Sequence, residues 1–243
     1  MKENILEIQK VSFGYNNKVN VLKDISFTGR AGVILVMAGP NGSGKTTLIK
    51  LIFDLLERKT GSITVFGEDN RSISAKKKIL YLQSDNELHL FLTGDEFVKL
   101  WCGMYEVPVD PALYAQLLQY YEMEESVHVL IERYSFGMIK KIQLIAAFLI
   151  QAEITIIDET LNGIDIKGRE VSLVLMRRLV QKGKLVLFCT HDLLLAERIG
   201  DRAELINDGK VFAEVDLPFT EKGRSLVQVF KEMIGFEESN YEL

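Results

Sequence analysis

The chain has 243 residues, 47% of them hydrophobic and 26% charged, with a formal net charge of −5. This composition supports a full hydrophobic core, and the acidic balance argues against a sequence-independent nucleic-acid binder, which is usually basic. Cys102 and Cys189 lie far apart and lack metal-ligand spacing, so we expect buried thiols in a reducing compartment. No apolar run approaches the ~20 residues that span a bilayer, and no signal-peptide region precedes the first strand. We therefore expect a cytoplasmic protein that does not bind nucleic acid.

The first third of the chain has the texture of strands. Residues 5–13 alternate in hydrophobicity, and residues 21–27 predict a second strand antiparallel to them. The apolar run 33–38 predicts a buried strand. Residues 47–56, which follow a glycine-rich segment at 39–46, predict a helix. Two shorter strands are predicted further on, at 61–67 and 79–82. The lysine run 76–78 between them is expected to be a solvated face.

Helical spacing dominates from about residue 86 to 151. Apolar residues recur there at three- and four-residue intervals, which predicts helices at 95–105, 111–121 and 137–150. Strand texture then returns at 154–157 and 185–188, with a predicted helix at 167–181 between them. A βαβ unit of this kind implies parallel strands. The dipeptide Asp208-Gly209 predicts a hairpin between strands 202–207 and 210–216, and an amphipathic helix is predicted at 220–234.

A glycine-rich segment lies between the predicted strand 33–38 and the helix that follows. It consists of Gly39, Pro40, Asn41, Gly42, Ser43, Gly44, Lys45 and Thr46. In this setting successive backbone N–H groups can converge on phosphate oxygens, assisted by the helix N-terminus. Lys45 can reach the β- and γ-phosphates, and the Thr46 hydroxyl can ligate Mg²⁺. We therefore predict ATP binding here, with Thr47 among the contacts.

Two carboxylates, Asp158 and Glu159, follow the predicted strand 154–157. A strand beside the phosphate-loop strand would place both at the carboxyl edge of the sheet. Asp158 is suited to hold Mg²⁺, and Glu159 is suited to orient and deprotonate an attacking water. His191 follows the strand 185–188, from which it could reach the γ-phosphate. The pattern predicts ATP hydrolysis with Glu159, His191 and Lys45 as catalytic residues.

These motifs resemble those of the nucleotide-binding subunits of ATP-binding cassette (ABC) transporters, and they come in family order between about residues 6 and 215. Residues 39–46 match Walker A, residues 154–159 match Walker B with its glutamate, and His191 matches the switch histidine. Residues 162–165 match the D-loop, which adds Asp165 to the expected nucleotide contacts. Tyr15 stands where the family has an aromatic ring that stacks on adenine.

The resemblance implies a P-loop NTPase fold of the α/β class. It has a mostly parallel sheet, an antiparallel β subdomain and an inserted α-helical subdomain. We expect a single ABC nucleotide-binding domain over residues 1–243. Its ATP-binding core would cover 1–85 and 152–216, its helical subdomain 86–151, and a helical extension 217–243.

Residues 134–138, Tyr-Ser-Phe-Gly-Met, stand where the family has its signature. Ser135 and Gly137 at a helix N-terminus would bind a phosphate of the ATP held by the opposite protomer. The Q-loop glutamine, which would contact ATP and Mg²⁺, corresponds to Ser84 in a gapless alignment. A shift of one residue assigns the role to Gln83, which we favour.

Two further departures from the family pattern concern Phe136 and Thr160. Phe136 replaces the first signature glycine, and Met138 replaces the glutamine. Phe136 cannot adopt a positive φ cheaply, so either the backbone does not need one or the site is distorted. Thr160 replaces the usual proline after Walker B, which is expected to be benign.

The resemblance implies a head-to-tail homo- or hetero-dimer that closes on ATP and Mg²⁺ at the cytoplasmic face of a membrane. The signature and D-loop look most like those of exporter ATPases that act with separate integral-membrane permease subunits. Leu88, Leu90, Phe91 and Leu92 would either line a docking groove for such a subunit or pack in the core. Two alternatives remain: an ABC ATPase not coupled to transport, as in iron–sulfur assembly, and a regulatory subunit that binds ATP without hydrolysing it.

Overall fold

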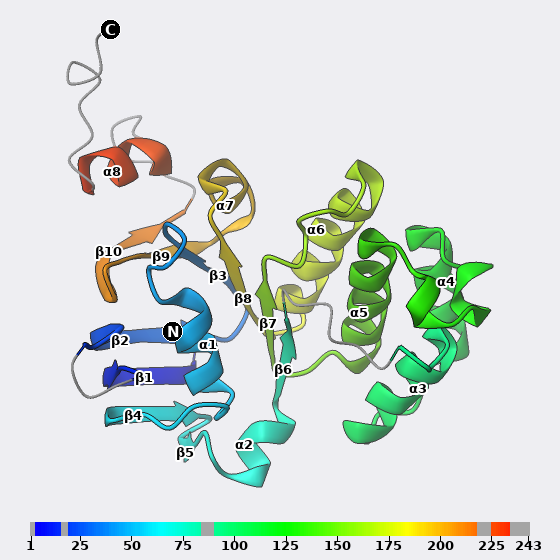
Figure 1. The fold of residues 1–243 in the computed structure, drawn as a ribbon, viewed down its shortest axis with the longest axis horizontal. Coiled ribbons are helices and arrows are strands. Elements are labelled where there is room, and N and C mark those ends of the chain that lie inside the picture. Colours follow the sequence, from blue (N-terminus) through cyan, green and yellow to red (C-terminus); the bar gives the residue numbers. More distant parts are fainter. Residues whose placement is uncertain (1–2, 16–18, 84–89, 218–224, 234–243) are drawn as a thin grey trace, which may run out of the picture. The chain divides into compact units, whose positions relative to one another are not determined.

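The computed structural model describes residues 3–15, 19–83, 90–217 and 225–233 (Figure 1). The chain divides into two compact units, one formed by residues 1–76 with 187–243 and the other by residues 77–186. Helices 95–105, 111–121 and 137–150 of the sequence analysis lie in the second unit, together with strands 79–82 and 154–157. This division differs from the expected split into a core and a subdomain at 86–151, which stays a prediction.

The first unit contains both amino- and carboxyl-terminal elements. They are β1 (Asn4–Phe13), β2 (Leu22–Arg30), β3 (Val33–Ala38), α1 (Lys45–Ile52), β4 (Thr60–Val65), β5 (Glu68–Asp69), α2 (Ile73–Lys77, ending at the unit boundary), α7 (Leu193–Ile199), β9 (Arg202–Asn207), β10 (Lys210–Asp216) and α8 (Leu226–Met233). Strand β8 (Leu185–Thr190) begins in the second unit and ends in the first.

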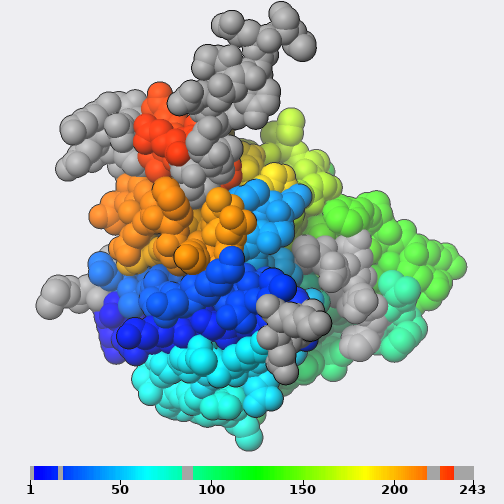
Figure 2. All heavy atoms as spheres, turned by 60° about the vertical axis from the view of Figure 1, so that its left-hand side comes forward, coloured from blue at the N-terminus to red at the C-terminus, as the bar shows by residue number. Residues whose placement is uncertain are grey.

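An antiparallel sheet of order β2-β1-β4-β5 forms one layer of the first unit. Ile8 pairs with Phe27 on one side and with Ile63 on the other, and all three side chains are buried. Strand β10 packs against β2, and Figure 2 shows the orange atoms of β9 and β10 beside the blue atoms of β1 and β2. The predicted antiparallel pairing of the first two strands is confirmed.

The second sheet of the first unit has the order β10-β9-β3-β8. Strand β3 is parallel to β9, and all six of its residues are buried, as the apolar run predicted. Strands β9 and β10 form the predicted hairpin. Asp208 and Gly209 both have positive φ, 47° and 73°, which suits the primed turns that favour this dipeptide.

The second unit contains strands β6 (Ile79–Leu82) and β7 (Ile154–Asp158), which pair in parallel. Its helices are α3 (Gly94–Met104), α4 (Pro111–Tyr121), η1 (Ser126–His128), η2 (Ile131–Arg133), α5 (Phe136–Ile150) and α6 (Ile166–Gln181). Helix α5 contacts α3, α4, α6 and β6, so eleven of its fifteen residues are buried (Figure 1). This packing explains why α5 is apolar on most of its circumference.

The predicted helices match the observed ones to within a residue or two where the chain carries capping signals. Helix α4 begins at Pro111 because the Asp110 carboxylate accepts hydrogen bonds from two first-turn N–H groups. Helix α3 begins with a capping box formed by Thr93 and Glu96. Strand β5 and the short helices α2 and α7 were not predicted from the sequence. The predicted final helix corresponds to α8, although residues 218–224 and 234–243 lie outside the described residues. Cys102 and Cys189 are buried thiols, as expected.

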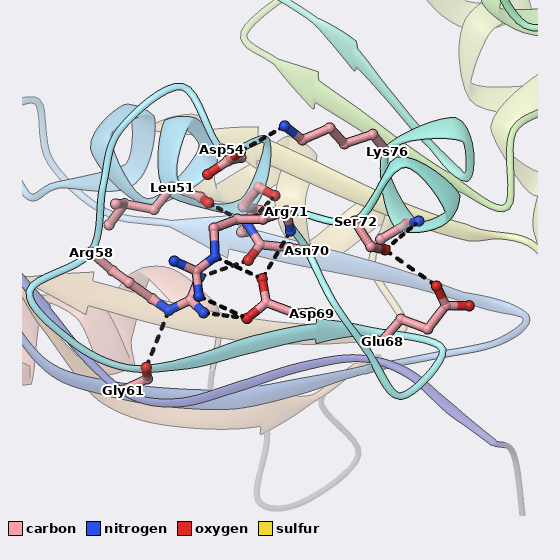
Figure 3. A network of polar contacts seen from close by, with 12 residues as sticks. Leu51, Asp54, Arg58, Gly61, Glu68, Asp69, Asn70, Arg71, Ser72 and Lys76 are labelled. Atoms are coloured by element: carbon pink, nitrogen blue, oxygen red, sulfur yellow. Dashed lines mark hydrogen bonds and ion pairs between the residues drawn. The ribbon is translucent and has the colours of Figure 1, made fainter.

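A polar network fixes the carboxyl end of α1 (Figure 3). The fully buried Asn70 amide donates to the carbonyls of Leu51 and Ile52 at 2.8 and 2.9 Å. Arg58 donates to the Asn70 carbonyl oxygen at 2.8 Å and pairs with Asp69. The hydrogen bonds from Arg71 to Asp69, followed by those from Arg58, hold the pKa of the Asp69 carboxyl well below its usual value. Orphan carbonyls at the end of α1 are thereby satisfied.

A buried ion pair lies in the hairpin of the first unit. Arg202 Nη2 donates to Glu204 Oε1 at 2.7 Å and to Glu214 Oε2 at 2.7 Å. Glu204 is fully buried, and its second oxygen has no partner among the described residues. Burial outweighs the attraction of Arg202 and raises the pKa of Glu204 from 4.5 to about 7.

Glu204 should make the first unit less stable as the pH rises. Between pH 4.5 and 7 the folded state retains a proton that the unfolded chain releases, so the free energy of unfolding falls across this window and levels off above it. We expect Glu204→Gln to remove this dependence, which is on the order of 3 kcal/mol. Thermal unfolding at pH 5 and pH 8 measures the difference. The exposed Glu124→Gln is the matched control; a Glu204→Gln profile parallel to the wild type would contradict the assignment.

Candidate functional site

The glycine-rich segment joins β3 to α1 as the sequence predicts. Gly44 is the N-cap of α1 and has φ 106°, a conformation that side-chain-bearing residues rarely adopt. Helix α1 therefore starts at Lys45, directly after the turn, and its first N–H groups point toward the loop. This arrangement provides the converging donors that a phosphate needs.

The Lys45 ammonium lies inside this loop. Its side chain is buried, and Nζ donates to the carbonyls of Gly39 at 2.8 Å and Pro40 at 3.0 Å. A lysine is seldom buried without partners, so these carbonyls fix where the positive charge sits. The charge therefore lies in the loop for which the sequence predicts binding of the β- and γ-phosphates.

The β9–β10 hairpin braces the loop from the side. Gly209 N donates to the Ser43 carbonyl at 3.1 Å, and Lys23 N donates to the Gly209 carbonyl at 2.7 Å. Ser43 is 2% exposed, and its hydroxyl has no hydrogen-bond partner in the described part of the chain. An unpaired buried hydroxyl is costly and suits a loop that binds phosphate oxygens. The sequence predicts the turn at Gly209 but not its contact with Ser43.

Tyr15 stands beside the start of α1. Its hydroxyl lies 3.2 Å from Thr47 Oγ1, and its ring meets Phe13 edge-on with centroids 5.0 Å apart. The side chain is 65% exposed, so a face of the ring is accessible for stacking. His191 directly follows β8 in the same unit and is exposed.

The two predicted carboxylates lie at the carboxyl end of β7, where Asp158 is the last residue of the strand and Glu159 follows it directly. Asp158 is 1% exposed, and Tyr81 donates its hydroxyl hydrogen bond to Asp158 Oδ2 at 3.3 Å. Glu159 is half-buried and has φ 51°, in the left-handed region that costs a non-glycine residue roughly 1–2 kcal/mol. Strain of this kind often accompanies a functional constraint. The sequence carries no signal for it.

The Q-loop candidate Gln83 directly follows β6 and is exposed. Its main-chain carbonyl accepts a hydrogen bond from Lys140 Nζ at 3.1 Å. Ser84 and Leu88 lie outside the described residues, so the assignment of Gln83 stays a prediction. Leu90 and Phe91 are 48% and 75% exposed and Leu92 is partly buried, so Leu90 and Phe91 do not pack in the core, while the docking groove stays a prediction.

The signature segment forms the start of α5. Ser135 is the N-cap and its hydroxyl accepts from Met138 N at 3.3 Å. Phe136 begins the helix and is not among the residues with positive φ, so the backbone there does not require glycine. A Cβ at Gly137 would lie 2.9 Å from the Gly163 carbonyl, which brings the signature into contact with the D-loop.

Asp165 caps α6 by accepting from Gly168 N at 2.7 Å and pairs with Lys141. The Lys141 contact, followed by the Gly168 N–H, lowers the pKa of the Asp165 carboxyl. Its carboxylate is thus already engaged within its own chain. The structure places the expected phosphate-loop residues, Tyr15 and His191 in the first unit, and the other expected site residues in the second.

Comparison with known proteins agrees with this geometry. The family model described as ABC transporter matches residues 22–162. The ABC transporter ATP-binding protein YdbJ of Bacillus subtilis is 32% identical over 91% of this chain and 72% of its own length. The chain belongs to the ABC transporter family. It is a single-cassette ATP-binding subunit, an ABC ATPase.

Other relatives of this ATP-binding subunit carry more specific names. The linearmycin resistance ATP-binding protein LnrL of B. subtilis is 30% identical, over 93% of this chain and 74% of that protein. The Nod factor export ATP-binding protein I of Rhizobium leguminosarum is 29% identical, over 86% of this chain and 68% of that one.

Solved structures give the same fold. A solved ATP-binding subunit of an ABC transporter has a TM-score of 0.86 and 29% identity, covering 95% of this chain and 99% of that one. A dimeric cassette in a post-hydrolysis state with ADP and Pi has a TM-score of 0.77 at 23% identity, over 88% and 99% of the two chains. The predicted fold class is confirmed. No helix among the described residues has the length and apolarity needed to cross a membrane.

Lys45 is expected to dominate nucleotide affinity in this subunit. Replacing it with alanine removes a charge-assisted contact to phosphate worth about 1.5–3 kcal/mol, so Lys45→Ala should weaken ATP binding roughly 10- to 100-fold. Titration with a fluorescent ATP analogue gives the affinity, and Lys50→Ala in the same helix serves as the control. Equal affinities for the Lys45→Ala and control proteins would remove Lys45 from the site.

Proposed function

We propose that this subunit hydrolyses Mg-ATP in a head-to-tail dimer and thereby powers export of a solute through separate integral-membrane permease subunits. The observation that carries the proposal is the Lys45 ammonium held inside a phosphate loop at the start of α1. Asp158 at the end of β7, Glu159 directly after it and the capped signature helix would supply the remaining groups that hydrolysis requires. The dimer would consist of two copies of this chain or of this chain and a related subunit.

ATP acts as an adhesive between the two subunits in this proposal. Its ~4 negative charges are shared between the phosphate loop of one protomer and Ser135 and Gly137 of the other. Ser135 already directs its hydroxyl to the N-terminus of α5, where backbone N–H groups gather. The closed dimer then binds ATP better than the open one, so ATP shifts the population toward closure.

We assign catalysis to Glu159 and His191. Glu159 orients and deprotonates the attacking water, and His191 stabilises the γ-phosphate. Mg²⁺ supplies charge neutralisation on the phosphates, and Thr46, Asp158 and Gln83 are the residues that would hold it. The described residues contain no group of three or more acidic, His or Cys side chains that could hold a metal. Asp158 is the one carboxylate among the three residues named, which fits Mg²⁺, since proteins usually bind this ion through one or two carboxylates and the substrate phosphates.

Export is supported by the similarity to the Nod factor export ATP-binding protein and by the exporter-like signature. The permease would contact the second unit through Leu90 and Phe91, whose side chains are exposed. Burial of these apolar side chains against the permease would favour association whether or not nucleotide is bound. The solute itself would be selected by the permease.

Glu159→Gln tests the hydrolytic assignment. The amide preserves shape but cannot accept a proton, so turnover should fall about 10²- to 10⁴-fold while ATP binding persists. Gel filtration with Mg-ATP should then show an ATP-held dimer, and phosphate release gives the rate. The exposed Glu132→Gln is the control. A Glu159→Gln protein that stays monomeric and hydrolyses ATP at the control rate would refute the role.

Permease association is tested by purification from detergent extracts of cells that produce the tagged chain. We expect a hydrophobic membrane protein to co-purify with the wild type, and Phe91→Ser to reduce its recovery several-fold because apolar contact area is lost. Val174→Ser, at an exposed position on α6, is the matched control. Recovery of the tagged chain in a complex without any membrane protein would favour the transport-independent alternative.

A further inference from the structure

Lys140 is a buried lysine that the proposed mechanism does not use. It lies in α5 and is 1% exposed, and among the described lysines only Lys45 is also buried. Burying an ammonium group costs several kcal/mol unless its donors are well paired. A group retained at this cost is a candidate for a specific task.

Two contacts of the Lys140 ammonium join separate motifs of the second unit. Nζ donates to the Gln83 carbonyl at 3.1 Å, directly after β6. It also lies 5.2 Å from the centroid of the Phe136 ring, one helical turn earlier in α5. The first turn of α5, which Ser135 caps, is thereby linked to the backbone segment Leu82–Gln83 at the end of β6.

A second side chain, that of Thr160, contacts the same segment. Thr160 directly follows the Walker B residues. Thr160 is fully buried, and its hydroxyl lies within hydrogen-bond distance of the carbonyls of Leu82, at 3.2 Å, and Asp158, at 3.3 Å. The consecutive carbonyls of Leu82 and Gln83 are therefore contacted by side chains from two different places. Thr160 adjoins Glu159, whereas Lys140 lies one turn from the signature.

Two of the positions at which the chain departs from the family pattern, Phe136 and Thr160, take part in these contacts. A proline at position 160 has no hydroxyl to offer Leu82, and a glycine at position 136 has no ring to offer Lys140. Phe136 and Thr160 thus each supply a contact that the usual residue could not make.

We infer that Lys140 is a positioning residue that holds the first turn of α5, and with it Ser135, against the backbone segment Leu82–Gln83. Thr160 holds that same segment to the turn at Glu159, so the signature and the catalytic carboxylate are placed by one connected set of contacts. The inference rests on the proposed function because it concerns the same hydrolytic site. Lys140 itself need not touch ATP.

The test compares Lys140→Met with Lys140→Arg in the full chain. Misplacing groups around the reacting atoms should lower kcat about 10- to 100-fold for Lys140→Met, with KM for ATP within a few-fold of the wild type. Arginine keeps the charge, the donors and the ring contact, so Lys140→Arg should recover most of kcat. Lys182→Met, at an exposed lysine, is the matched control.

A double-mutant cycle tests the link to Phe136. Phe136→Leu should lower kcat less than Lys140→Met does, and adding it to Lys140→Met should cost little more, because both remove the same contact. Additive losses would overturn the link. If Lys140→Met does not fold, Phe136→Leu and Thr160→Val serve as the test by themselves. We expect each of these two variants to have a lowered kcat and an unchanged KM for ATP. Wild-type kcat in both would overturn the inference.

Wild-type ATPase activity separates this inference from the proposed function. A wild type that binds ATP without turnover would defeat the proposed hydrolysis itself. A wild type that hydrolyses ATP, beside a Lys140→Met protein with unchanged kcat and only a lower melting temperature, would defeat the positioning role alone. That second result would assign Lys140 to stability.

Discussion

Holding the Lys45 ammonium at the centre of the phosphate loop is the constraint on which the first unit depends. The carbonyls of Gly39 and Pro40 accept from it, so the loop must curl back over its own helix start. The phosphate loop and helix α1 are held by contacts at two places. The β9–β10 hairpin fixes Ser43 through Gly209, and the buried amide of Asn70 fixes the far end of α1. A helix anchored in this way keeps its N-terminal donors aimed at the loop.

Much of this could be predicted from the sequence because the signals are local. Asp110 and Pro111 mark the start of α4, and Asp208-Gly209 marks the hairpin, each through contacts within a few residues. Walker A is a contiguous motif whose residues all belong to one strand–loop–helix turn. Helix α7 was missed because its seven residues give too few turns for a periodic pattern.

The parts that could not be predicted depend on partners far along the chain. The contact of Gly209 with Ser43 joins two segments that no local pattern relates, and the positive φ of Glu159 leaves no mark in composition. Whether the backbone at Phe136 needs a positive φ could not be predicted from the sequence. As the first residue of α5 it follows the Ser135 cap, and its φ is not positive.

The two buried lysines show how one kind of contact serves two different ends. Each donates to main-chain carbonyls, so each ammonium takes its position from the path of the backbone. Lys45 binds carbonyls five and six residues away, and its charge therefore moves with the loop it belongs to. Lys140 binds a carbonyl 57 residues away, so a displacement of α5 would displace the backbone at Gln83, and the reverse. Sequence separation thus decides whether a buried ammonium shapes one motif or connects two.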